Sequence, residues 1–109
     1  MINLNMEKKM KLITAEIAKK TPRLYEQSEK GDDAIAYAKF FTPDSSWTWY
    51  MTEYDPEQRL AFGYVCGFEK ELGYFSIDEL KRVRGKMGLP IERDRFFTPM
   101  TLREVKKLQ

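Results

Sequence analysis

The chain has 109 residues and a formal net charge of +2, and its length suits one domain with a single hydrophobic core. It has no histidine and one cysteine, Cys66, which excludes an internal disulfide and a cysteine-based zinc site and removes the commonest general base. No apolar run approaches the roughly 20 residues that cross a bilayer, and the first residues lack a secretory signal. We therefore predict a cytoplasmic protein with no membrane span and with Cys66 as a buried, free thiol.

The N-terminal part of the sequence predicts one short helix. Thr14 is a suitable N-cap for a helix through about Lys20. Pro22 discourages its continuation, because proline lacks a backbone donor and restricts the residue before it. We predict that residues 1–9 are a flexible extension and that residues 10–109 form a single α+β domain.

Four strands are predicted in the middle of the chain, at residues 35–41, 47–54, 60–68 and 72–75. Aromatic and β-branched residues are frequent in these segments, and the short connections favour an antiparallel four-stranded meander. A later segment, residues 91–97, is either an extended connection or an additional edge strand, because its two phenylalanines follow four charged residues.

Two capping boxes predict the later helices. Ser76 with Glu79, and Thr101 with Glu104, have the spacing at which a hydroxyl and a carboxylate satisfy backbone donors at a helix start. Apolar residues follow each box at helical spacing. The predicted fold class is therefore α+β, with an antiparallel four-stranded meander packed by short N-terminal, middle and C-terminal helices.

The register of the central hairpin decides which aromatic side chains face the core. If residues 55–58 form a four-residue loop, Trp49 faces Tyr64 and the large residues share one buried face. If the loop has one more residue, the tryptophans instead cover Gly63 and Gly67. We favour the first register.

This register leaves the second face of the sheet free for a partner. That face would carry tyrosine and threonine hydroxyls beside small residues, and acidic side chains in the neighbouring turns would surround it. We expect a protein partner to bind there. The predicted partner-binding residues are Asp44, Tyr50, Glu53, Tyr54, Asp55, Glu69 and Glu71.

Charge is segregated along the sequence. Residues 1–23 carry six basic and two acidic side chains, residues 24–80 carry four and twelve, and residues 81–109 carry nine and three. The three segments therefore have net charges of +4, −8 and +6. If they stay apart in space, this pattern favours electrostatic recognition of a partner. If the basic ends fold back instead, they neutralise the acidic middle within the monomer.

A nucleic-acid-binding protein is the first alternative. Basic residues near the C-terminus would supply phosphate contacts, although no known reader motif is present. Arg93, Arg95 and Arg103 are the residues to test. The wider basic set consists of Lys81, Arg82, Arg84, Lys86, Arg93, Arg95, Arg103, Lys106 and Lys107.

A metal-dependent nuclease is the second alternative. Carboxylates in neighbouring turns would hold magnesium for phosphodiester chemistry. The candidates are Asp44, Glu53, Asp55, Glu69 and Glu71. Their spacing matches no metal motif, and acidic turns on a solvated sheet edge explain the same residues. We therefore predict no catalytic residue, no metal and no cofactor.

Three phrases, FTPDSSWTWY, ELGYFS and GLPIERD, point to a family. Together they resemble domain of unknown function 2958, a family of bacterial and mobile-element proteins, and the resemblance covers about residues 10–102. It implies an accessory role in transfer, replication or evasion of host defence, and it carries over no catalytic residue. We therefore predict a noncatalytic binding protein of a mobile genetic element that binds a host protein through its acidic sheet surface. The sequence does not indicate whether the protein is a monomer or an oligomer.

Overall fold

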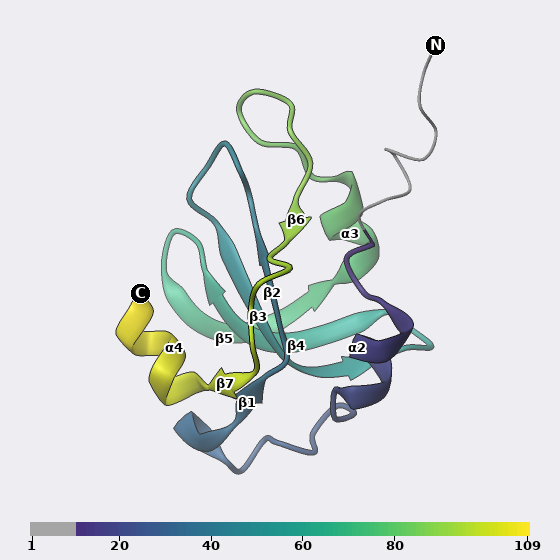
Figure 1. The fold of residues 1–109 in the computed structure, drawn as a ribbon, viewed down its shortest axis with the longest axis vertical. Coiled ribbons are helices and arrows are strands. Elements are labelled where there is room, and N and C mark those ends of the chain that lie inside the picture. Colours follow the sequence, from purple (N-terminus) through teal and green to yellow (C-terminus); the bar gives the residue numbers. More distant parts are fainter. Residues whose placement is uncertain (1–10) are drawn as a thin grey trace.

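A five-stranded antiparallel sheet forms the centre of the molecule, in a computed structural model that describes residues 11–109 (Figure 1). The strand order is β5-β4-β3-β2-β6. The strands are β2 (Ala38–Phe41), β3 (Thr48–Asp55), β4 (Leu60–Cys66), β5 (Lys70–Ser76) and β6 (Glu92–Arg93). The predicted α+β meander is confirmed, and β6 extends it at the edge beside β2. The predicted extension, residues 1–9, lies outside the described residues.

The helices begin where the sequence predicts them. Thr14, Ser76 and Thr101 are the N-caps, and each hydroxyl accepts a hydrogen bond from a backbone N–H in the first turn. The elements are α2 (Ala15–Lys20), α3 (Ile77–Arg82), α4 (Leu102–Leu108) and the 3-10 turn η1 (Gly31–Asp33). A small second sheet pairs β1 (Ile35–Ala36) with β7 (Met100–Thr101). None of the described helices is long and apolar enough to cross a membrane.

Hydrophobic clusters cover both faces of the sheet. Side chains alternate along β3, so that Trp49 and Met51 belong to one cluster while Tyr50 belongs to the other. The first cluster includes Leu12, Phe40, Phe75, Ile77, Leu80 and Ile91, and the second includes Ala36, Tyr64, Cys66, Leu102 and Val105. The prediction of a free second face is therefore wrong, because α4 packs on it.

Cys66 is a buried member of the second cluster, which includes Leu102 and Val105 of α4. It is 4% exposed and forms no disulfide. Burial raises the pKa of its thiol, because the charged thiolate would lose its hydration. The neutral form is therefore favoured, and the prediction of a buried thiol with a packing role is confirmed.

The favoured register of the β3–β4 hairpin is wrong. Trp49 pairs with Val65, one residue away from the predicted partner, and the four-residue loop is residues 56–59. The alternative register is right only in part: Trp47 covers Gly67, where an added Cβ would lie 2.3 Å from the indole ring, but Gly63 lies closest to the main chain of Tyr50. Gly67 therefore makes room for an aromatic side chain.

A β-bulge in β3 explains why loop length alone could not give the register. The pairing with β4 shifts between Met51 and Glu53, which leaves Thr52 as an extra residue. Beyond the bulge the alternation moves by one residue. Tyr54 therefore packs in the first cluster, with Ile77 and Leu80 of α3. The prediction that it lies on an open face is wrong.

Candidate binding surfaces

Glu53, predicted to present charge to a partner, is buried. It is 2% exposed, and its carboxylate accepts hydrogen bonds from the backbone N–H of Tyr25 at 2.7 Å and of Gln27 at 2.8 Å. Tyr25 has a φ of 76°, a conformation that is rare for a residue other than glycine. The carboxylate thus holds a strained loop on the bulged strand, and its role is structural.

Asp44 and Asp55 each accept hydrogen bonds from the main chain of a loop. Asp44 Oδ2 accepts from the N–H of Met87 at 2.7 Å and of Leu89 at 3.3 Å, which joins the β2–β3 loop to the loop between α3 and β6 (Figure 1). Asp55 Oδ1 accepts from the N–H of Glu57 at 2.9 Å. Asp55 therefore has the local role that its turn requires, whereas Asp44 connects two loops that are distant in the sequence.

The carboxylates proposed for a metal site do not meet. Asp44 precedes β3 and Asp55 ends it, so that an eight-residue strand, about 25 Å long, separates them. Within residues 11–109, no group of three histidine, cysteine, aspartate or glutamate side chains lies close enough to hold a metal ion. The carboxylates assigned to the metal-dependent nuclease therefore do not form a metal site.

The two tyrosines predicted to face a partner are also buried. Tyr50 is 1% exposed and Tyr54 is 4% exposed, and the Tyr50 hydroxyl accepts a hydrogen bond from Gln109 Nε2 at 2.6 Å. Burial raises the pKa of both phenols. Of the seven predicted partner-binding residues, Glu69 and Glu71, near the β4–β5 turn, are the two that are exposed.

The basic C-terminal helix folds back on the acidic middle of the chain. Arg103 Nη2 lies 2.7 Å from Asp33 Oδ1, and Lys106 Nζ lies 2.7 Å from Asp32 Oδ1. The Lys106 ammonium lowers the pKa of Asp32 through this hydrogen bond. Arg103 is thus paired with Asp33, whereas Arg93 and Arg95 line a hollow that Arg103 does not reach.

A basic groove of about 1230 Å³ lies on the other side of the sheet, between α2, α3 and β6. Apolar side chains such as Leu12, Ile77 and Ile91 line it together with charged residues. Among the described residues, its one carboxylate is Glu92. Its cations are Lys11, Arg59, Lys81, Arg84 and Arg95.

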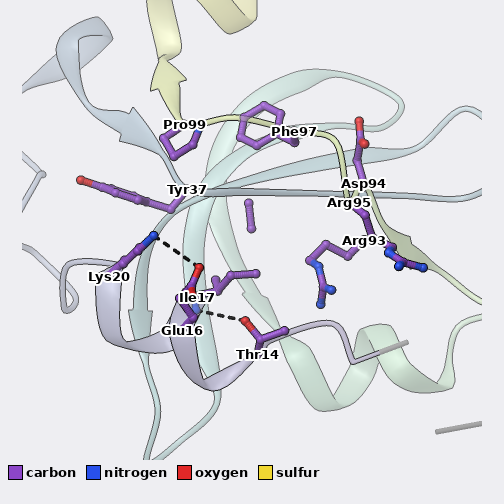
Figure 2. A pocket seen from close by; sticks show the side chains of 11 residues that line it. Thr14, Glu16, Ile17, Lys20, Tyr37, Arg93, Asp94, Arg95, Phe97 and Pro99 are labelled. Carbon is purple, nitrogen blue, oxygen red and sulfur yellow. Dashed lines mark hydrogen bonds and ion pairs between the residues drawn. The ribbon is translucent and has the colours of Figure 1, made fainter. Parts of the chain in front are cut away.

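A second hollow has a volume of about 480 Å³ (Figure 2). Figure 2 shows Lys20 directed at Glu16 within it, and these side chains form an ion pair at 3.3 Å. Thr14 and Arg95 line both hollows. The two hollows therefore form neighbouring parts of one concave region, and Arg95 stands where they meet.

Three of the groove cations are available to a ligand. Lys11, Lys81 and Arg95 form no ion pair with any other residue in the part of the chain that the structure describes. Arg59 instead pairs with Asp78 at 2.8 Å. The guanidinium of Arg84 donates to main-chain carbonyls at the end of α3.

Arg93 lines the second hollow and fixes a segment that borders the groove. Its guanidinium donates to the carbonyl oxygens of Lys11 and Leu12, which fixes the segment before α2 against β6. Burial, and then the nearby charge of Arg95, lowers the pKa of Arg93. Of the three arginines chosen from the sequence, Arg95 is therefore the one that is exposed, unpaired and in the groove.

Sequence reasoning missed Lys11 and Arg59. Lys11 precedes α2 and Arg59 ends the β3–β4 loop, so both reach the groove only through tertiary packing. Gln27 was missed as well, although it is 3% exposed and its side chain bonds the main chain of Ile35 and Thr52. A glutamine in a polar stretch gives no signal of such a role.

The fold and the site define a small α+β domain with a basic groove beside a two-sided hydrophobic core. The chain belongs to the family described as Protein of unknown function (DUF2958), which matches residues 4–104. The resemblance noted in the sequence is thereby confirmed. Searches of curated proteins and of solved structures found no match.

Proposed function

We propose that this protein is a small noncatalytic binding protein of a mobile genetic element, and that its basic groove binds the phosphate backbone of a nucleic acid. The observation that carries the proposal is the charge of the groove, which five cations and one carboxylate line among the described residues; three of the cations, Lys11, Lys81 and Arg95, form no ion pair there. Clustered lysine and arginine side chains favour a polyanion, because each phosphate contact releases condensed counterions. The mobile-element setting rests on the family resemblance.

The groove favours backbone binding over base reading. Its cations come from the segment before α2, the β3–β4 loop, α3 and the segments around β6, so the charges follow the length of the groove. The adjoining helices α2 and α3 have six residues each, and neither resembles a recognition helix. We therefore expect binding that depends strongly on salt and weakly on sequence.

A salt series tests the proposal. Fluorescence anisotropy with labelled single-stranded and double-stranded DNA and RNA should give a logarithm of the binding constant that falls linearly with the logarithm of salt concentration. Lys81→Gln should make the slope shallower by about one, since it removes one phosphate contact. Lys107→Gln is the matched control, because Lys107 is exposed on α4 and does not line the groove.

Two results would reject nucleic-acid binding in the groove. One is the absence of salt-sensitive binding at low ionic strength. The other is an equal change of slope in K81Q and K107Q, because a general loss of charge would then explain the effect. A lower affinity in both variants with a shallower slope only in K81Q would support the groove.

A host protein is the second candidate partner, and two exposed carboxylates favour it. Glu69 and Glu71 extend from the sheet edge near the β4–β5 turn, with no ion pair among the described residues. We expect a basic partner captured from host lysate to be released at lower salt by the double variant Glu69→Gln and Glu71→Gln than by the wild type. Release at the same salt concentration would remove this surface from consideration.

A further inference from the structure

Strand β5 is an open edge of the sheet in the part of the chain that the structure describes, because β4 is its one neighbour in the strand order. Two backbone hydrogen bonds fix which residues face β4: the Ile77 N–H donates to Arg59 O, and the Gly67 N–H donates to Glu69 O, both at 3.0 Å. In an antiparallel pair, successive residues direct their backbone groups alternately toward and away from the partner. The odd-numbered residues of β5 therefore face β4.

The even-numbered residues of β5 direct their N–H and C=O groups away from the sheet. For Leu72 and Tyr74, no group among the described residues occupies these outward positions. Their side chains are 51% and 53% exposed. The ring of Tyr74 also lies 4.9 Å from that of Phe62, which is half-buried.

The centre of this edge lacks the usual protection against pairing. Native edge strands are shielded by lysine, proline, bulges or a covering segment. In β5 the charged residues, Lys70 and Glu71, stand at its start, and the next residues, LGYFS, carry neither charge nor proline. The pairing of β4 with β5 is continuous, without a bulge. A second strand can therefore add along the centre of this edge, beside Leu72 and Tyr74.

We propose that β5 pairs with β5 of a second copy of this chain, antiparallel, with the two-fold axis at Gly73. This inference is independent of nucleic-acid binding, because the groove lies on another part of the molecule. An isologous antiparallel pair places one residue opposite itself. Gly73 is the middle residue of the strand Lys70–Ser76, so this axis lets the whole strand pair.

Charge favours this register over one with its axis at Glu71. An axis at Glu71 would set two carboxylates directly opposite each other, which is unfavourable. An axis at Gly73 puts Leu72 opposite Tyr74 of the second copy and opposes no like charges. A Cβ added at Gly73 would meet nothing within 4 Å, so the space beside this residue is open. The pair covers both exposed side chains and satisfies the outward backbone groups.

Sedimentation velocity tests the self-pairing. A small interface of this kind has micromolar affinity, so the wild type is examined from about 1 to about 500 μM. We expect a shift from monomer to dimer across this range. Leu72→Lys should abolish the shift, because the charge would lie against the second copy. Leu89→Lys is the matched control, since Leu89 is 44% exposed in the loop before β6, at the opposite edge.

A disulfide tests the register. At the proposed axis the two Gly73 Cα atoms form a pair without direct hydrogen bonds, about 4.5 Å apart, within the range of a disulfide. Gly73→Cys should therefore give a covalent dimer on mild oxidation. Glu71→Cys should not, because the two copies of that position would be about 13 Å apart. The native thiol, Cys66, is buried and does not compete.

The outcomes distinguish pairing of β5 with a second copy from pairing of β5 with a strand of another protein. A wild type that stays monomeric over the whole range overturns the proposal and leaves the edge to a strand of another protein. A dimer that persists in L72K overturns it as well. Covalent dimers from E71C but not from G73C would reject the assigned register, whereas a dimer lost only in L72K and trapped only by G73C supports it. Circular dichroism confirms that each variant is folded.

Discussion

Gly63→Ala is expected to lower the free energy of unfolding by about 3 kcal/mol, whereas Gly73→Ala, at the position paired with it on β5, should have little effect. A Cβ added at Gly63 would lie 1.8 Å from the carbonyl oxygen of Tyr50 and 2.8 Å from its carbonyl carbon. Both atoms belong to the backbone of β3, so no side-chain rotation can relieve the contact. The strands would have to separate at the centre of the sheet.

Urea unfolding followed by tryptophan fluorescence measures this difference, at low protein concentration so that association does not contribute. Gly73→Ala is the matched control, because nothing lies within 4 Å of its added Cβ. Alanine there should be neutral or stabilise by about 0.5 kcal/mol, since it restricts the unfolded chain. Equal stability of the two alanine variants would contradict the close approach of β3 and β4.

Local signals in the sequence were sufficient for the helix starts and the meander, but not for the small β1–β7 sheet, which takes the first residues of the predicted strand 35–41. Thr101 forms both halves of the capping box with Glu104, and Thr14 caps α2 through the N–H of Ile17. These contacts join residues three positions apart, so spacing alone predicts them. The meander followed for a similar reason, because short connections leave few ways to pair successive strands.

The two faces of the sheet could not be predicted, because their burial depends on distant contacts. Tyr50 is covered by a cluster that includes Leu102 and Val105, which lie more than fifty residues later in the chain. The bulge at Thr52 then moves Tyr54 to the opposite cluster. Hydrophobic alternation predicts that a strand has two faces, and it does not say that a C-terminal helix will cover the second one.

The candidate site was only partly visible in the sequence for a related reason. Lys81, Arg84 and Arg95 belonged to the basic set predicted for phosphate contacts, and all three line the groove. Arg103 has the same chemistry but lies against Asp33 on the α4 side. Charge along the chain indicates which residues can bind a polyanion, and only packing decides which of them share a surface.

Glu53→Gln is expected to lower the free energy of unfolding by about 2 to 3 kcal/mol, although it is nearly isosteric. The carboxylate of Glu53 accepts one backbone N–H on each oxygen, from Tyr25 and from Gln27. An amide keeps one acceptor and turns a second donor toward an N–H, which leaves a buried donor unsatisfied. The φ of 76° at Tyr25 adds to the loss, because this conformation depends on the carboxylate.

Two measurements distinguish this anchoring role from a general effect of lost charge. Urea unfolding gives the stability, and hydrogen exchange should show faster exchange at the amides of Tyr25 and Gln27 in E53Q. Glu57→Gln makes the same chemical change at an exposed position in the β3–β4 loop and should leave both quantities unchanged. If E53Q were as stable as E57Q, the buried carboxylate would not be what holds the loop. Because Glu53 follows the bulge at Thr52, loss of its contacts should also loosen the strand at the point where its side chains change faces.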